Sequence, residues 1–170
     1  SAPSSVSITM SNDKFFEGID IDIASYMDII MTREDGTTEQ LKCKSGYTWR
    51  DTNDTQYSMF YSSGDEDWNA NEYYYSFPNK AGVYTLTIAF YDKKIDGYKQ
   101  LGSTKVTIMS LDEYDFPTLS IGENKVHSAE FEEVYDNNIY KFIVPYEGKI
   151  EIAENPEYSI YTLKDGVKTY

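Results

Sequence analysis

The chain has 170 residues with 29 acidic and 15 basic side chains, one histidine and one cysteine, and its formal net charge is -14. This charge argues against nucleic acid and anionic membranes as partners, because their binding requires clustered Lys and Arg side chains. One cysteine excludes a disulfide framework within the chain. No apolar stretch approaches the roughly 18 residues of a membrane-spanning helix, so no membrane insertion is expected.

Apolar and polar residues alternate with a period of two along most of the chain, and this pattern predicts strands. Isoleucines and aspartates alternate over residues 18–24, which indicates a strand with one buried and one solvated face. Further strands are expected over residues 26–32, 37–42, 56–62 and 72–77. Asp35-Gly36 predicts a tight turn between the strands expected over residues 26–32 and 37–42.

The clearest strand covers residues 82–91, where Tyr84, Leu86, Ile88 and Phe90 would face the core and the threonines would face outward. Asp96-Gly97 is a second turn signal, and residues 104–109 close this block. Seven or so short strands in about 100 residues are typical of an immunoglobulin-like or fibronectin-like β-sandwich. We expect this domain to cover residues 1–110.

Residues 111–118 are acidic, end near a proline and are interpreted as a linker. Residues 119–170 would form a second, smaller or incomplete β-sandwich, with strands over residues 138–145, 148–154, 158–164 and 167–170. Asp165-Gly166 predicts a hairpin turn before the last of these strands. The short length of this part favours a domain that continues beyond Tyr170.

Residues 56–109 resemble the triple-tyrosine repeat of extracellular bacterial proteins. The similarity rests on Tyr57 and Tyr61, on Asp67-Trp68, on Tyr75-Ser76-Phe77 and on the segments over residues 81–88 and 104–108. It covers about a third of the chain. The resemblance implies an immunoglobulin-like domain in which these tyrosines and the tryptophan fill the core.

The second block resembles the start of a bacterial prepeptidase C-terminal-type domain, on residues 140–145, 148–152 and 159–161. Such domains are β-sandwiches appended to exported enzymes. Both resemblances imply non-catalytic modules of a secreted or surface-attached protein. Residues 1–5 have no charged or apolar signal-peptide region, so any signal peptide would be removed or lie upstream.

Residues 65–72 form the most concentrated acidic cluster. Asp65, Asp67, Asn69 and Asn71 place oxygen ligands at alternate positions, which suits Ca²⁺. Asp51, Asn53 and Asp54 could contribute from a neighbouring loop. The cluster departs from the helix-loop-helix calcium pattern because Ala70 stands where glycine is required. The competing interpretation is a solvated acidic loop, and no other cofactor is expected.

An aromatic set raises carbohydrate binding, because flat rings on a β-sandwich can stack against sugars. Its members are Tyr47, Trp49, Phe60, Tyr73 and Tyr75. Trp49 stands out because it lies in a polar segment where a core tryptophan is less expected. The competing interpretation is that these side chains cap the sandwich edge or alternate into its core.

Catalytic signatures are absent from the sequence. Cys43 and His127 are far apart along the chain, and a nucleophile–base pair between them is not expected. There is no glycine-rich phosphate loop, no Gly-x-Ser-x-Gly and no His-Glu-x-x-His motif. The sequence therefore favours a protein that is not an enzyme.

Three functions remain open at this point. The first is a non-catalytic binding or spacer module of a secreted or surface-attached bacterial multidomain protein. The second is a carbohydrate-binding module of a polysaccharide-degrading system that uses exposed aromatics. The third is an inhibitor or adhesin-like protein-binding module that uses an exposed sheet edge. The expected partner is accordingly a polysaccharide or a protein, and the oligomeric state stays open.

Overall fold

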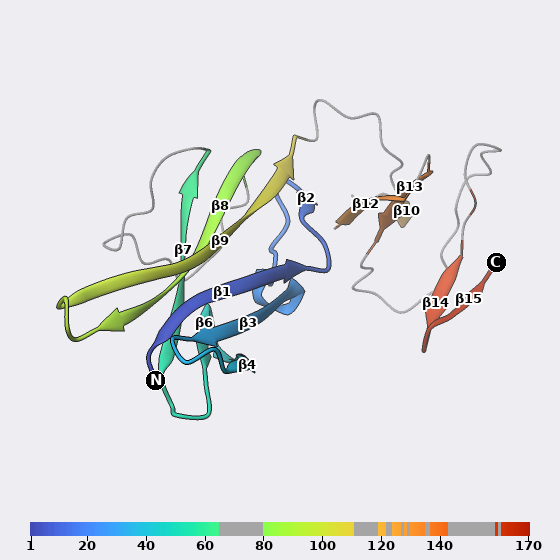
Figure 1. Ribbon diagram of the computed structural model, residues 1–170. Coiled ribbons are helices and arrows are strands. Elements are labelled where there is room, and N and C mark those ends of the chain that lie inside the picture. The colour runs from blue at the N-terminus through green and yellow to red at the C-terminus, as the bar shows by residue number, and fades with distance from the viewer. Residues whose placement is uncertain are drawn as a thin grey trace.

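Figure 1 shows the chain as a computed structural model, which describes residues 1–64, 80–110, 119–121, 124–126, 128, 130–134, 137–142, 159 and 161–170. Its described elements are strands and one short 3-10 helix. In chain order they are β1 (Pro3–Met10), β2 (Lys14–Phe16), η1 (Ile23–Tyr26), β3 (Met27–Arg33), β4 (Thr38–Gln40), β5 (Lys42–Ser45), β6 (Thr48–Arg50), β7 (Gln56–Ser63), β8 (Gly82–Asp92), β9 (Gly97–Met109), β10 (Leu119–Ile121), β11 (Asn124–Val126), β12 (Glu130–Val134), β13 (Asn137–Lys141), β14 (Thr162–Lys164) and β15 (Val167–Thr169). The predicted all-β class is confirmed.

Two sheets face each other, and most of their strands come from the first part of the chain. The smaller has the strand order β1-β3-β4, and the larger has the order β13-β12-β2-β9-β8-β7-β6-β5. Consecutive strands are neighbours from β5 to β9, so this part of the larger sheet is a meander (Figure 1). Two separate hairpins, β10-β11 and β14-β15, follow. The two-layer β-sandwich is therefore confirmed, and the resemblance to particular families remains a prediction.

The core between the two sheets consists of alternate residues of the facing strands. Its members on the longest strands are Ile29 and Met31 of β3, Tyr57 and Met59 of β7, and Tyr84, Leu86, Ile88 and Phe90 of β8. The core positions predicted for residues 82–91 are thus correct. Thr87, which was expected to face solvent, is only 2% exposed, so β8 is buried on both faces in its middle.

A bulge and a glycine let β1 of the smaller sheet lie directly on β9. The β8–β9 pairing shifts register by one residue between Ile88 and Ala89, which leaves Leu101 as an extra residue on β9. A Cβ atom at the adjacent Gly102 would lie 2.5 Å from the carbonyl oxygen of Val6. Only glycine therefore allows the two backbones to approach this closely.

Tyr84 anchors the start of β8. Its hydroxyl donates a hydrogen bond to the carbonyl oxygen of Lys80 at 2.8 Å, and its ring lies beside Gly82. A tyrosine that bonds to backbone a few residues upstream is a corner device of β-sandwiches. This contact explains the Gly-x-Tyr spacing of the sequence.

β2 joins the beginning and the end of the first sandwich. It pairs in parallel with β9, with Lys14 opposite Thr107 and Phe16 opposite Met109. Its other edge pairs with β12 at Phe15 and Glu130, so strands from the second half of the chain extend the larger sheet. A second small core of Phe16, Met109 and Phe131, with Tyr140 packed against it, lies at this junction.

Several elements differ from the sequence-based expectation. The strand predicted over residues 18–24 is wrong: Gly18 adopts a positive φ of 79°, and the chain then forms η1. Ile23 and Ala24 are both buried although they are neighbours, which a strand with one buried face does not allow. β1, β2 and β6, in contrast, are strands where the sequence pattern predicts none, although Val6 and Ile8 of β1 alternate with serines.

Candidate functional site

The aromatic side chains predicted to bind sugars are core residues where the structure describes them. Trp49 is 2% exposed, Tyr47 is 9% exposed and Phe60 is 1% exposed. An enclosed ring offers no face to a sugar, so for these three side chains the structure agrees with the competing interpretation, in which they belong to the core. Tyr73 and Tyr75 lie outside the described residues.

Trp49 is buried although its segment is short and polar. It lies in the middle of β6, where it is paired with Cys43 of β5 and Tyr57 of β7. Its neighbours Thr48 and Arg50 point to the other, partly exposed face of the strand. The alternation is thus present, but over three residues it is too brief to distinguish a strand from a loop.

The proposed calcium ligands Asp65, Asp67, Asn69 and Asn71 also lie outside the described residues, so calcium binding stays a prediction that calorimetry with Ca²⁺ can test. Within the described part of the chain, no three His, Cys, Asp or Glu side chains form a group that could hold a metal ion. Asp51, considered as a contributor, is engaged in a different set of contacts.

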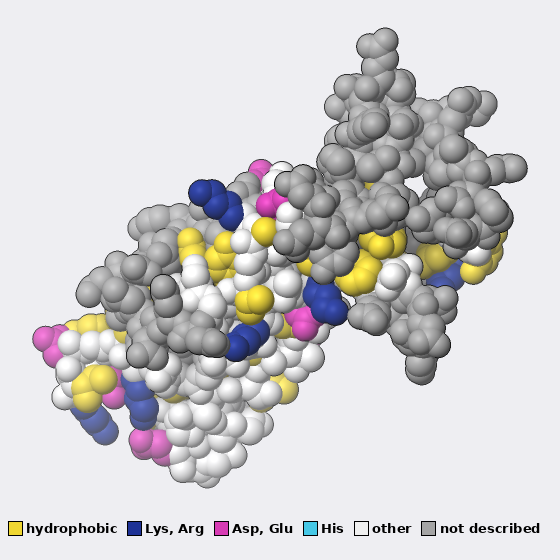
Figure 2. Space-filling view, turned by 90° about the horizontal axis from the view of Figure 1, so that it is seen from above, with side chains coloured by type: hydrophobic (Ala, Val, Ile, Leu, Met, Phe, Trp, Pro, Cys, Tyr) yellow, Lys and Arg dark blue, Asp and Glu magenta, His cyan; other side chains and the backbone are white. Residues whose placement is uncertain are grey.

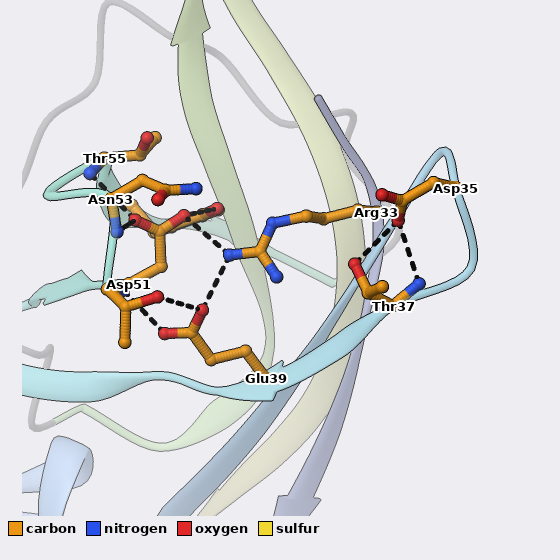
Figure 3. A network of polar contacts seen from close by, with 9 residues as sticks. Arg33, Asp35, Thr37, Glu39, Asp51, Asn53 and Thr55 are labelled. Atoms are coloured by element: carbon orange, nitrogen blue, oxygen red, sulfur yellow. Dashed lines mark hydrogen bonds and ion pairs between the residues drawn. The ribbon is translucent and has the colours of Figure 1, made fainter. Parts of the chain in front are cut away.

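Asp51 is the centre of a buried polar network at one end of the sandwich (Figure 3). Its side chain is only 2% exposed. The Oδ1 atom accepts hydrogen bonds from the backbone N–H groups of Asn53 and Thr55, both at 2.9 Å. The Oδ2 atom accepts the hydroxyl hydrogen bond of Tyr57 at 2.8 Å. One carboxylate therefore closes the β6–β7 turn and fixes a core tyrosine.

Arg33 and Glu39 connect the opposite sheet to this turn. The Nη2 atom of Arg33 lies 2.6 Å from Glu39 Oε1 and 3.6 Å from Asp51 Oδ2. Glu39 also accepts hydrogen bonds from the backbone N–H of Thr52 at 2.6 Å and from its hydroxyl at 2.9 Å. Because Arg33 and Glu39 belong to β3 and β4, the network joins the two sheets.

These contacts shift the pKa values of their members. The hydrogen bond with Glu39 raises the pKa of Arg33, and the same bond holds the pKa of Glu39 below its usual value. Burial, followed by the hydrogen bond to Asp51, raises the pKa of the Tyr57 hydroxyl. All three groups are held in their ordinary protonation states at neutral pH, which suits a structural connection rather than proton transfer.

The sequence alone gave little signal for this network. Arg33 and Glu39 lie on the paired strands β3 and β4, but Asp51 lies in the β6–β7 turn, so all three meet only when the two sheets face each other. The Asp51 turn has one local signal, since Asp-x-Asn-Asp is rich in residues whose side chains bond to nearby backbone. Asp54, at a positive φ of 61°, completes the turn.

The end of the β8–β9 hairpin carries exposed aromatic and aliphatic side chains. Tyr91 is 47% exposed, Ile95 is 61% exposed and Tyr98 is 37% exposed. Tyr91 and Tyr98 are opposite each other in the register, and their ring centroids lie 5.8 Å apart. Figure 2 shows hydrophobic, basic and acidic side chains together at the end of the molecule that this hairpin forms.

A shallow depression of about 220 Å³ lies at the junction of the two halves. It is lined by residues 10–14 and by Phe131 and Glu132. The Nδ2 atom of Asn12 is buried there and has no hydrogen-bond partner among the residues that the structure describes. Lys14 lies over the ring of Phe131, with its Nζ atom 5.8 Å from the centroid. The lining is mixed in charge and defines no particular ligand.

The comparisons with known proteins return no match. No protein-family model, no curated protein and no solved structure matches this chain. The described residues also include no helix that is long and apolar enough to cross a membrane.

Proposed function

We propose that this chain is a non-catalytic binding module of a secreted or surface-attached bacterial multidomain protein. The observation that carries the proposal is the contrast between two turns at the same end of the larger sheet. The Asp51 network buries its charged groups in the β6–β7 turn, whereas exposed apolar side chains gather on the neighbouring β8–β9 hairpin. A rigid β scaffold with its contact residues on loops is the usual design of a binding domain.

The placement of exposed hydrophobic residues supports binding over a pure spacer role. Of the five large hydrophobic side chains exposed within the described residues of the first sandwich, three lie between residues 91 and 98. Scattered exposed apolar residues are ordinary, but a group at one site is typical of an interaction surface.

The second candidate is a carbohydrate-binding module of a polysaccharide-degrading system. Buried Trp49 and Tyr47 no longer support it, but Tyr91 and Tyr98 provide exposed rings on one face of a sheet. Paired tyrosines with hydroxyl groups at the rim can contact both the apolar face and the hydroxyls of a sugar.

Two arrays test the proposed function. The purified chain is applied to a glycan array with and without Ca²⁺ and to an array of secreted and surface proteins. We expect saturable binding to one class of ligand and no release of reducing ends from bound glycans. Silence on both arrays would favour a spacer over a binding module, and turnover of a bound glycan would contradict the non-catalytic role.

A further inference from the structure

The end of the β8–β9 hairpin is a small, well-defined surface, which we call the hairpin-tip surface. Its members are Tyr91, Lys93, Lys94, Ile95, Asp96 and Tyr98. The pairs Tyr91–Tyr98 and Asp92–Gly97 extend past Phe90, which is the last β8 residue paired with β7. The tip therefore projects beyond the neighbouring strand (Figure 1).

The two tyrosines of this surface are held from behind and from the side. Tyr98 packs edge-on against buried Phe60, with ring centroids 5.2 Å apart. Tyr91 meets Tyr98 at an interplanar angle of 81°, and its hydroxyl donates a hydrogen bond to Asp96. The turn itself is closed by Asp92, whose Oδ1 accepts the N–H of Lys94 at 3.0 Å. Rings fixed in this way lose little conformational entropy when a ligand binds.

The area of the surface indicates the size of its ligand. If a full side chain of this size has roughly 200 Å², the exposed fractions of Tyr91, Ile95 and Tyr98 leave about 300 Å² of apolar surface. A stable protein–protein interface needs about 800 Å² on each partner. The tip is too small for such an interface, whereas one or two sugar rings would cover it.

The charge of the surface indicates that the ligand is neutral. Lys93 and Lys94 are balanced by Asp92 and Asp96 within the same turn, while the whole chain carries a charge of -14. An anionic polymer would be repelled by the chain as a whole and would gain no net attraction at the tip. A neutral polysaccharide is not repelled, and its hydroxyl groups can pair with both ammonium and carboxylate groups.

We propose that the hairpin-tip surface binds a neutral polysaccharide by stacking a sugar ring on Tyr91, with the nearly perpendicular ring of Tyr98 beside it, while Lys93 and Asp96 contact its hydroxyl groups. This inference rests on the proposed function and specifies its ligand class and contact residues. It moves the sugar-binding aromatics from the buried β6 strand to the exposed end of the β8–β9 hairpin.

Affinity electrophoresis of the full chain tests the inference. Native gels contain laminarin, mannan or xylan as neutral probes and polygalacturonate as an anionic probe. We expect at least one neutral polysaccharide to retard the chain. Tyr91→Ala should weaken this binding about tenfold, because it removes most of one stacking face. Tyr91→Phe should bind nearly as the parent chain does, since it keeps the ring.

Val83→Ser is the matched control, because Val83 is 43% exposed on the same strand but lies at its other end. Thermal melting of each variant checks that it folds, and Tyr91→Ala removes no buried side chain. No retardation by any neutral probe would overturn the inference. Binding that Tyr91→Ala leaves unchanged would also overturn it. Binding of polygalacturonate alone, or of a protein alone, would overturn it as well. The last two results would still leave the chain a binding module, so they separate failure of this inference from failure of the proposed function.

Discussion

Replacing Asp51 by alanine tests whether the polar network holds the two sheets together. The change removes the acceptor of the backbone N–H groups of Asn53 and Thr55 and of the Tyr57 hydroxyl. It also removes the second carboxylate near Arg33, which keeps its contact with Glu39.

The expected loss is large relative to the total stability. A hydrogen bond to a charged group contributes about 1.5–3 kcal/mol, and removal of one partner from a buried ionic contact costs about 3–5 kcal/mol. These contributions are not additive, and Arg33 keeps one partner. We therefore expect the free energy of unfolding to fall by about 3–4 kcal/mol for Asp51→Ala, out of a typical total of about 5–15 kcal/mol.

Urea denaturation followed by tryptophan fluorescence measures this change. Trp49 is 2% exposed and lies two residues before Asp51, so it reports directly on the region. With an m value of about 1.5 kcal/mol/M, the midpoint should fall by about 2 M or somewhat more. Asp54→Asn is the matched control in the same turn. Its side chain is 85% exposed in its ion pair with Arg50, and its loss should cost less than about 1 kcal/mol.

The reasoning would be refuted if Asp51→Ala unfolded within about 0.5 kcal/mol of the parent chain, which is the range of ordinary surface substitutions. It would also be refuted if Asp54→Asn were as costly as Asp51→Ala. In either case the buried contacts of Asp51 would not be what fastens this end of the sandwich.

Three further predictions follow from the described residues. Gly102→Ala should lower the free energy of unfolding by about 1–3 kcal/mol, because its Cβ atom would meet the Val6 carbonyl oxygen. Gly97→Ala, whose Cβ atom would have its nearest neighbour at 3.9 Å, should change the melting temperature little; equal melting temperatures of the two variants would contradict this. Because the pKa of Glu39 is lowered in the folded chain, its stabilising contribution is fully present above about pH 4.3 and is lost as the pH falls through the folded-state pKa. Glu39→Gln should therefore flatten this part of a plot of unfolding free energy against pH, and parallel curves for the variant and the parent chain would disprove it. Cys43 is exposed, although partial desolvation of its thiol raises the pKa. A thiol reagent should therefore modify one group per chain without denaturant, with a rate that still increases above pH 8.5; a requirement for urea would show that the thiol is inaccessible.

The sequence predicted the parts of the fold that depend on long local patterns. Residues 82–91 alternate over five periods, and the core side chains from Tyr84 to Phe90 are those that the alternation selects. The three Asp-Gly turns are also correct, with Gly36 and Gly166 in left-handed conformations and Asp96 at a positive φ of 49°. Such turns need no tertiary contact to specify them.

The remaining errors have a common physical cause, which is that tertiary contacts decided the outcome. Residues 18–24 alternate well, but Ile23 and Ala24 are both drawn into the core and a helical turn forms there. Trp49 lies in a polar segment, but the strands on either side cover it. In each case the neighbours that bury the side chain are distant in the sequence.

The candidate sites were less predictable than the fold. Asp51 and Arg33 are ordinary surface residue types, and only the packing of two sheets brings them within 3.6 Å. Tyr91 is out of phase with Tyr84, Leu86, Ile88 and Phe90, so the alternation places it on the face away from the core. Tyr98 is opposite Tyr91 and shares that face, but the extension of the hairpin past Phe90, the last β8 residue paired with β7, is specified by no local pattern.

The parallel pairing of β2 with β9 has a mechanical consequence. Tension applied along the chain pulls β2 toward the N-terminus and β9 toward the C-terminus, so the two strands are drawn past each other along their length. The bonds from Thr107 to Asp13 and from Glu17 to Met109 bracket this pair and would have to break together with those between them. A shearing load is shared among all of these bonds, whereas a peeling load breaks them one at a time. This strand pair is therefore placed to keep the sandwich closed when the protein is stretched between its ends.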